Sequence, residues 1–195
     1  NGFGGAASLL VATAEFYRVG AFPIFIFFTI ALSILIGSVT FSGSFIAFLK
    51  LQGIMKGSPI QFKGQHAFNG LLVVLVITSS IYGLLNPLQL GSIFLIIIGV
   101  SLLLGILFVL PIGGADMPVV ISLLNSFSGL AACATGFVIQ NDALIISGSL
   151  VGASGIILTD IMCKGMNRTI WNVLFAGVGS TDAITDNLQV DPMKS

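Results

Sequence analysis

The feature that most constrains this chain is a series of long apolar runs separated by short polar breaks. The runs "AFPIFIFFTIALSILIG", "GLLVVLVITSSIYGLL" and "SIFLIIIGVSLLLGILFVL" approach or exceed the roughly 20 residues that cross a bilayer as a helix. Charged residues make up only 7% of the chain, whereas soluble domains carry about 25%. The pattern therefore predicts an all-α, polytopic membrane protein.

Windows of about 20 residues place about six spans between breaks rich in glycine, proline and polar residues. The expected helices are 1–17, 21–49, 67–86, 91–110, 117–139 and 142–163. The first residues resemble the middle of a helix and lack the layout of a signal peptide. We therefore expect the chain to be a fragment or a processed piece of a longer protein.

The basic residues are distributed unequally between the two sides of such a bundle. One side would carry Lys50, Lys56, Lys63, Lys164, Arg168 and Lys194. Only Arg18 falls on the other side, so the positive-inside rule places the C-terminus in the cytoplasm or the mitochondrial matrix. The polar tail has no apolar periodicity. We expect a membrane domain at 1–179 and a linker at 180–195 that leads to a further domain.

Composition and motifs exclude several kinds of function. Seven basic residues balance seven acidic ones, so no basic surface for nucleic acid is expected. Cys133 and Cys163 lie in separate apolar runs, as packing residues rather than disulfide partners or metal ligands. No P-loop and no strand followed by G-x-G-x-x-G and a helix is present, so no nucleotide site is expected in this chain.

Asn125 lies about midway along the expected helix 117–139 and is followed by Ser126. An amide in the middle of a bilayer costs several kcal/mol unless its hydrogen bonds are made, so it should face the bundle interior or water. One interpretation is a single hydrogen bond between helices. The other is a relay position, where amides and hydroxyls hold a water chain that carries protons. The residues alone leave both open.

Three glycines share one face of the expected helix 142–163, because Gly148, Gly152 and Gly155 are spaced by four and three residues. Such a face lets another backbone approach closely. Helix packing is one explanation for this glycine face, and a helix that shifts against its neighbour is the alternative. Near the end of this helix, Asp160 and Lys164 can pair across one turn.

Several polar residues lie at expected helix ends. Asp116 can cap the helix at 117, with Pro118 in its first turn, or it can make an interfacial contact. Asn141 or Asp142 can cap the helix that follows. His66 is expected in a loop at the mouth of a helix. Lys164 and Arg168 can anchor the chain at the headgroups.

Three motifs together resemble the membrane part of the beta subunit of proton-translocating NAD(P) transhydrogenase. They are "GGADMPVVISLLNSFSG" (113–129), "SGSLVGASGIIL" (147–158) and "IMCKGMNRT" (161–169). The stretch 37–51 extends the similarity, whereas 67–110 matches only in hydrophobic character. The resemblance implies that protons cross this domain while hydride passes between NADH and NADP on other domains. NAD(H) and NADP(H) would then bind elsewhere in the complex.

The resemblance also implies partners. These are membrane lipid, an alpha subunit with further membrane helices and an NAD-binding domain, an NADP-binding domain C-terminal to this chain, and a second copy of the complex in a homodimer. The implied location is a bacterial inner membrane, or the mitochondrial inner membrane in a eukaryote.

The resemblance assigns roles residue by residue. Asn125 and Ser126 match polar positions of the proton pathway. Coupling to the NADP-binding domain is implied for Asp116 and Arg168, and we add their neighbours Lys164 and Asp160, although Asp160 is not typical of the family. The three glycines match the helix that leads to that domain.

Asn1 is the third residue assigned to the proton pathway, because it falls where many family members carry an intramembrane histidine. An amide cannot exchange a proton near neutral pH, so we expect the titratable group on a partner subunit's helix. His66 matches no pathway position.

Two other functions are compatible with the apolar pattern. A secondary transporter predicts broken helices at corresponding places in inverted repeats. A structural membrane anchor predicts that Asn125, Ser126 and Asp116 tolerate apolar replacement.

Overall fold

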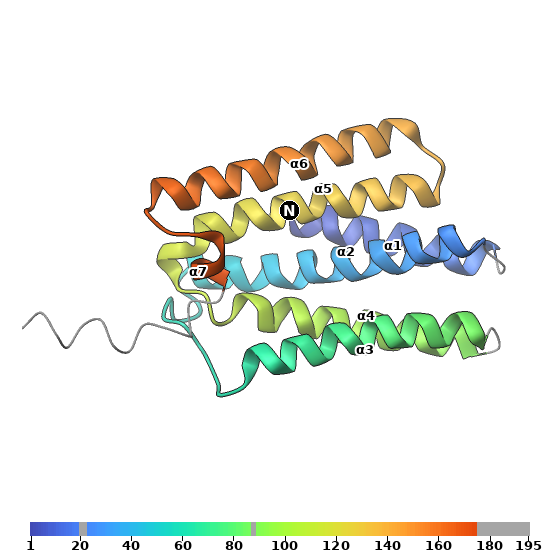
Figure 1. Cartoon of the computed structure of the whole chain (residues 1–195), viewed down its shortest axis with the longest axis horizontal. Coiled ribbons are helices and arrows are strands. Elements are labelled where there is room, and N and C mark those ends of the chain that lie inside the picture. The colour runs from blue at the N-terminus through green and yellow to red at the C-terminus, as the bar shows by residue number, and fades with distance from the viewer. Residues whose placement is uncertain (20–22, 87–88, 175–195) are drawn as a thin grey trace, which may run out of the picture.

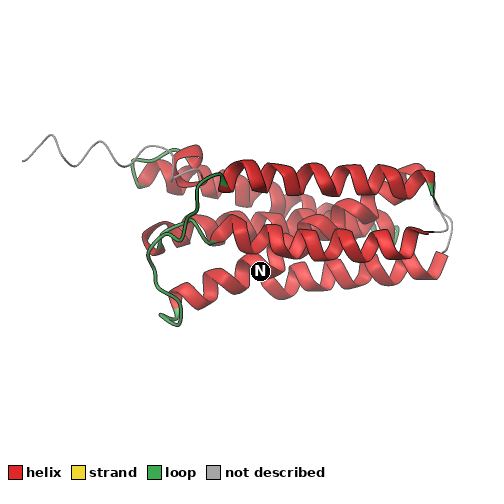
Figure 2. Ribbon diagram, turned by 90° about the horizontal axis from the view of Figure 1, so that it is seen from below, coloured by secondary structure: helices red, strands yellow, loops and turns green. Residues whose placement is uncertain are grey.

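The computed structural model describes residues 1–19, 23–86 and 89–174. Its elements are α1 (Gly2–Val19), α2 (Ile24–Leu51), α3 (Gln65–Leu85), α4 (Leu90–Val109), η2 (Gly114–Asp116), α5 (Met117–Val138), α6 (Asp142–Gly165) and α7 (Ile170–Leu174). The long helices run side by side in one elongated bundle, and no strand occurs in these ranges (Figures 1 and 2). The predicted all-α fold is confirmed. Residues 175–179 of the expected membrane domain and the expected linker 180–195 lie outside the described residues.

Each expected helix is present, with ends within three residues of those predicted. Among the described residues, five segments are long and apolar enough to cross a membrane, namely α2, α3, α4, α6 and Gly114–Val138, which joins η2 to α5. α1 carries Glu15 and Arg18 near its end and is not among these five. Five candidate spans, with α1 as a further long helix, are roughly consistent with the expectation of about six spans.

The two ends of the bundle differ in charge. We call one end the basic end, because the end of α2, the residues 52–64 and the end of α6 with the segment after it lie there (Figure 1). These segments carry Lys50, Lys56, Lys63, Lys164 and Arg168. Arg18 lies at the opposite end. The distribution follows the sequence pattern, while the orientation of the basic end in a cell stays a prediction.

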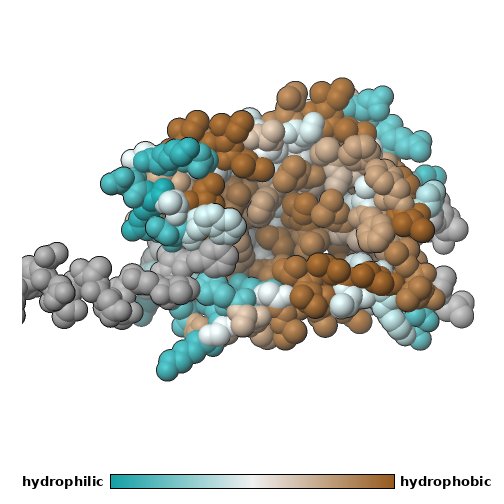
Figure 3. Space-filling view, in the orientation of Figure 1, coloured by the Kyte–Doolittle hydropathy of each residue, from teal (hydrophilic) through white to brown (hydrophobic). Residues whose placement is uncertain are grey.

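α2 is the central helix, since it packs against α1, α4 and α5. α1 begins near the middle of the bundle and covers only the half of α2 farther from the basic end (Figure 1). In that half, the rings of Phe16 and Phe94 stack with centroids 3.9 Å apart, and Phe27 meets Phe94 edge-on. Many large apolar side chains instead face outward around the middle of the bundle, between hydrophilic ends (Figure 3). This belt is the surface expected of a helix bundle in lipid.

The sequence predicted the start of α6 correctly and the start of α3 incorrectly. Asn141 caps α6, because its side chain accepts a hydrogen bond from the Leu144 N–H at 3.0 Å, as expected. His66 was expected in a loop, and this is wrong. The turn at Gly64, which has a φ of 86°, ends the loop early, so that α3 begins at Gln65 and His66 lies in its first turn.

Lys50 is a buried cation near the end of α2, with only 5% of the residue exposed. Its Nζ donates hydrogen bonds to the carbonyl oxygens of Leu110 at 2.6 Å and Ile112 at 2.8 Å. Carbonyls at a helix C-terminus lack partners within the helix and favour a cation. Lys50 therefore ties the end of α2 to the turn that leads from α4 to η2, a role that the count of basic residues did not reveal.

We expect Lys50→Met to lower the melting temperature of the purified complex by several degrees. The substitution keeps most of the buried stem but removes two hydrogen bonds to a charged donor, each worth about 1.5–3 kcal/mol. Scanning calorimetry measures the change. Lys56→Met, at an exposed position of the 52–64 loop, is the matched control and should melt like the unaltered protein. Equal melting of the two variants would contradict the assigned role.

Candidate functional site

Asp116 forms the one ion pair in the described part of the chain that joins the start of α5 to the segment after α6. The residue is 6% exposed, and its Oδ2 accepts a hydrogen bond of 2.7 Å from Nη1 of Arg168. The expected role of Asp116 as a helix cap is wrong. Its backbone is already helical (φ −93°, ψ −1°) because η2 continues directly into α5, and a capping side chain requires a non-helical backbone. The carboxylate is thereby left for Arg168.

Arg168 reaches Asp116 because α6 ends in a tight reversal. Asn167 adopts a left-handed backbone with φ 57°, a conformation that asparagine tolerates better than most residues. The Arg168 N–H then donates to the Cys163 carbonyl at 2.9 Å, a hydrogen bond typical of a Schellman motif. This reversal turns the chain back over the start of α5, where α7 packs.

Asp160 and Lys164 form the expected pair, with Oδ2 and Nζ 2.6 Å apart. Their side chains are 46% and 74% exposed, and exposed pairs of this kind contribute little to stability. The four expected coupling residues thus form two separate pairs. Only Asp116 and Arg168 connect different elements.

α5 and α6 form the most extensive helix pairing in the described chain. Ser126 is fully buried between them, and its hydroxyl donates to the Gly152 carbonyl at 2.5 Å. One turn nearer the basic end, the Thr159 hydroxyl donates to Ser122 Oγ at 3.0 Å. Ser126 therefore joins two helices in this structure.

The glycine face of α6 lies directly on α5. A Cβ added to Gly148 would lie 2.5 Å from the Cys133 nitrogen, and one added to Gly155 would lie 2.7 Å from Ser126 Cβ. At Gly152 it would lie 2.7 Å from a methyl carbon of the Leu130 side chain. In this structure the three glycines therefore lie at the contact between α5 and α6. Their role in movement stays a prediction.

Asn125 faces outward from the described helices, since its side chain lies on the exposed face of α5. It makes no hydrogen bond to any described residue, so the interior of this bundle does not satisfy its amide. Asn1 lies beside it and donates from Nδ2 to the carbonyl of Ile121, one turn earlier, at 3.0 Å. Of the two surroundings expected for Asn125, the interior of these helices is excluded. Water or another chain would have to satisfy the amide.

One buried polar contact was missed by the sequence analysis. Ser33 of α2 and Thr135 of α5 share a hydrogen bond of 2.6 Å between their hydroxyls, and both lie close to the Ser8 carbonyl of α1. Hydroxyls within apolar runs are the signal that could have indicated this junction. It joins three helices in the half of the bundle away from the basic end.

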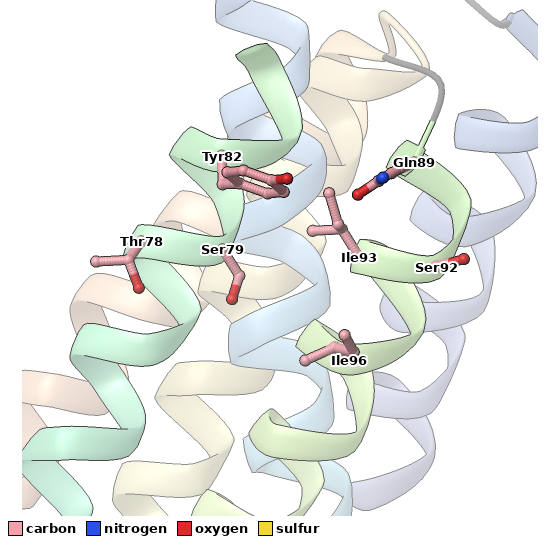
Figure 4. A pocket seen from close by; sticks show the side chains of 7 residues that line it. All are labelled: Thr78, Ser79, Tyr82, Gln89, Ser92, Ile93 and Ile96. Atoms are coloured by element: carbon pink, nitrogen blue, oxygen red, sulfur yellow. The ribbon is translucent and has the colours of Figure 1, made fainter. Parts of the chain in front are cut away.

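Two cavities lie in different parts of the bundle, one beside Asn1 and one between α3 and α4. An apolar crevice of about 510 Å³ begins at Asn1 and is lined mainly by phenylalanine and leucine side chains of α1, α2 and α5. A more polar pocket of about 640 Å³ lies between α3 and α4, where Tyr82 and Gln89 point toward the space between the helices (Figure 4). It contains none of the expected site residues.

Almost the whole chain is similar in sequence to known proteins. A profile of the family described as "NAD(P) transhydrogenase beta subunit" matches residues 1–194. Two relatives named "NAD(P) transhydrogenase subunit beta" come from Rhodospirillum rubrum, one of them from a specified strain. Each is 45% identical over 188 residues, which are 92% of this chain and 40% of the relative. The chain therefore spans less than half the length of these relatives.

We expect Gly155→Ala to weaken the pairing of α5 and α6. The added Cβ would press on Ser126 Cβ, Cα and N at 2.7–3.1 Å, none of which is the far end of a flexible side chain. Overpacking of this kind costs about 1–3 kcal/mol, so the melting temperature of the complex should fall by several degrees. Gly165→Ala, whose Cβ would meet no atom within 4 Å, is the control on the same helix. Unchanged melting of Gly155→Ala would show that the helices are not in the contact described.

Proposed function

The chain belongs to the NAD(P) transhydrogenase beta-subunit family, and from this premise we propose that it forms the membrane domain through which protons cross. In this proposal, proton transfer is coupled to hydride transfer between NADH and NADP. The described residues contain no strand, so they cannot form the strand–loop–helix site typical of dinucleotide binding. Both nucleotides would bind to other domains of the complex.

The observation that carries the proposal is the convergence of the family's site residues on one helix pair. Asn125 and Ser126 lie on α5, the glycines lie on the facing side of α6, and the Asp116–Arg168 pair joins the two at the basic end. α7 (Ile170–Leu174), the last described helix, begins two residues after Arg168. We propose that changes at Asn125 reach an NADP-binding domain through this pair.

α6 is the helix best placed to move. It packs on α5 through one face, while its opposite face is exposed. A shift of α6 would break the hydrogen bond from Ser126 to Gly152 and would pull Arg168 away from Asp116. The carboxylate, whose Oδ1 already lacks a partner among the described residues, would then be buried without its cation. Such a state costs about 3–5 kcal/mol, enough to make the two positions of α6 distinct.

Asn125 would act as a guide for protons and not as their carrier. An amide offers two donors and one acceptor but does not titrate near neutral pH. We propose that its exposed amide faces water and a titratable side chain from the alpha subunit. Membrane helices of that subunit, a homodimer of the complex and a bacterial or mitochondrial inner membrane complete the proposal.

We expect Asn125→Leu to reduce proton translocation driven by hydride transfer in sealed vesicles by at least tenfold, because the leucine cannot orient water or a partner's side chain. Proton uptake is followed with a pH-sensitive dye, and hydride transfer with a nicotinamide analogue. Ser154→Ala, which removes an exposed hydroxyl bonded to its own helix, is the control. Full coupled activity of Asn125→Leu would refute the pathway and favour a structural anchor.

The ion pair is tested by a double-mutant cycle on Asp116→Leu and Arg168→Leu. Arg168→Leu leaves a buried carboxylate unpaired and should lower the melting temperature, whereas the double variant should recover much of it. Coupled proton translocation should stay low in both. Lys164→Leu removes a cation that is 74% exposed and should leave melting unchanged. Recovery of coupled activity together with stability in the double variant would show that the pair is only structural.

A further inference from the structure

An apolar crevice of about 450 Å³ lies beside α3, between it and parts of α2, α4 and α5. Its walls come from α2, α4 and α5 on one side, through residues that include Leu35, Leu104 and Phe127, and from α3 on the other. α3 pairs with α4 but makes few contacts with α2, so the space between them is not closed by helix packing. Figure 1 places α3 at the edge of the bundle, on the opposite side from α6.

Gly70 lies on the α3 wall of this crevice. A Cβ added there would meet no atom within 4 Å, in contrast to the glycines of α6. No helix therefore approaches Gly70 in the described chain. An apolar space of this size left empty would forfeit the dispersion contacts of all the side chains that line it.

Toward the basic end the crevice has both polar and apolar residues in its lining, the apolar ones including Pro111 and Leu174. His66 and Asn69 line it, three residues apart on the same face of α3. The Oδ1 atom of Asn69 is buried and has no hydrogen-bond partner among the described residues. The crevice thus combines an apolar lining with the unsatisfied amide oxygen of Asn69. Lys63, an exposed cation, precedes the start of α3 by two residues.

We propose that this crevice binds an anionic phospholipid with a hydroxyl-bearing headgroup, such as phosphatidylglycerol. One acyl chain lies between α3 and α2, which fills the apolar space. The phosphate lies at the mouth near Lys63 and His66, because basic sites at the membrane surface favour anionic headgroups. A headgroup hydroxyl supplies the donor that Asn69 Oδ1 lacks. The inference needs only the location of the bundle in a membrane and is independent of proton transfer.

The acyl-chain site is tested by photolabelling. Vesicles that contain the complete complex receive phosphatidylglycerol with a diazirine in one acyl chain, and labelled peptides are identified by mass spectrometry. Label should appear on the α2, α3, α4 and α5 peptides that line the crevice. Gly70→Leu should reduce it at least fivefold because the new side chain occupies the crevice. Gly99→Leu, at an equally open and exposed glycine of α4 that does not line the crevice, should not.

The headgroup contacts are tested in the same vesicles with phosphatidylcholine that carries the same diazirine chain. Label from phosphatidylglycerol should exceed label from phosphatidylcholine severalfold in the unaltered protein, and Asn69→Leu should remove most of this preference. Thr78→Val, which removes an α3 hydroxyl outside the crevice, should keep it. Absence of label from the crevice, equal label in Gly70→Leu, or no preference between the two lipids would each overturn the proposal.

Discussion

The close approach of helix backbones at glycine residues is the constraint on which the rest of this structure depends. Helices in lipid gain no hydrophobic free energy from touching each other, so they associate through van der Waals contact and hydrogen bonds, which require short distances. Gly5 and Gly37 bring α1 onto α2, and Gly129 and Gly152 bring α5 onto α6. A hydroxyl as short as that of Ser126 can reach a carbonyl on the neighbouring helix only because these backbones nearly touch.

The two outer helices, α6 and α3, differ in how closely a neighbouring helix approaches their glycine residues. α6 has a continuous glycine face, lies flat on α5 and is connected to it at the basic end by Asp116 and Arg168. α3 has a glycine at position 70 that no helix approaches, and a crevice results. Glycine residues therefore mark a contact between two helices on one side of the bundle and a crevice open to lipid on the other side.

The sequence predicts the helices well because length and apolar composition are local properties of each run. Contacts between helices depend on which face meets which neighbour, and this is where prediction failed. Asp116 has the residue type of a cap, yet η2 makes its backbone helical and leaves its carboxylate for Arg168. The ammonium group of Lys50 is buried where it donates to carbonyl oxygens of the residues that follow α4, about 60 residues away in the chain. α7 was missed, since its five residues form no apolar run long enough to recognise.

The position of Asn125 has a consequence for any proton path through this family of domains. A polar side chain enclosed by its own bundle can be satisfied by that bundle, and its function then survives in the isolated subunit. Asn125 instead lies on the outer face of α5, beside Asn1 at the start of α1. Exposure of an amide to hydrocarbon is costly, so a folded complex has to cover it with water or with another polar group. In the proposed proton path, the chemistry of this position would therefore be shared between this chain and the group that lies against it.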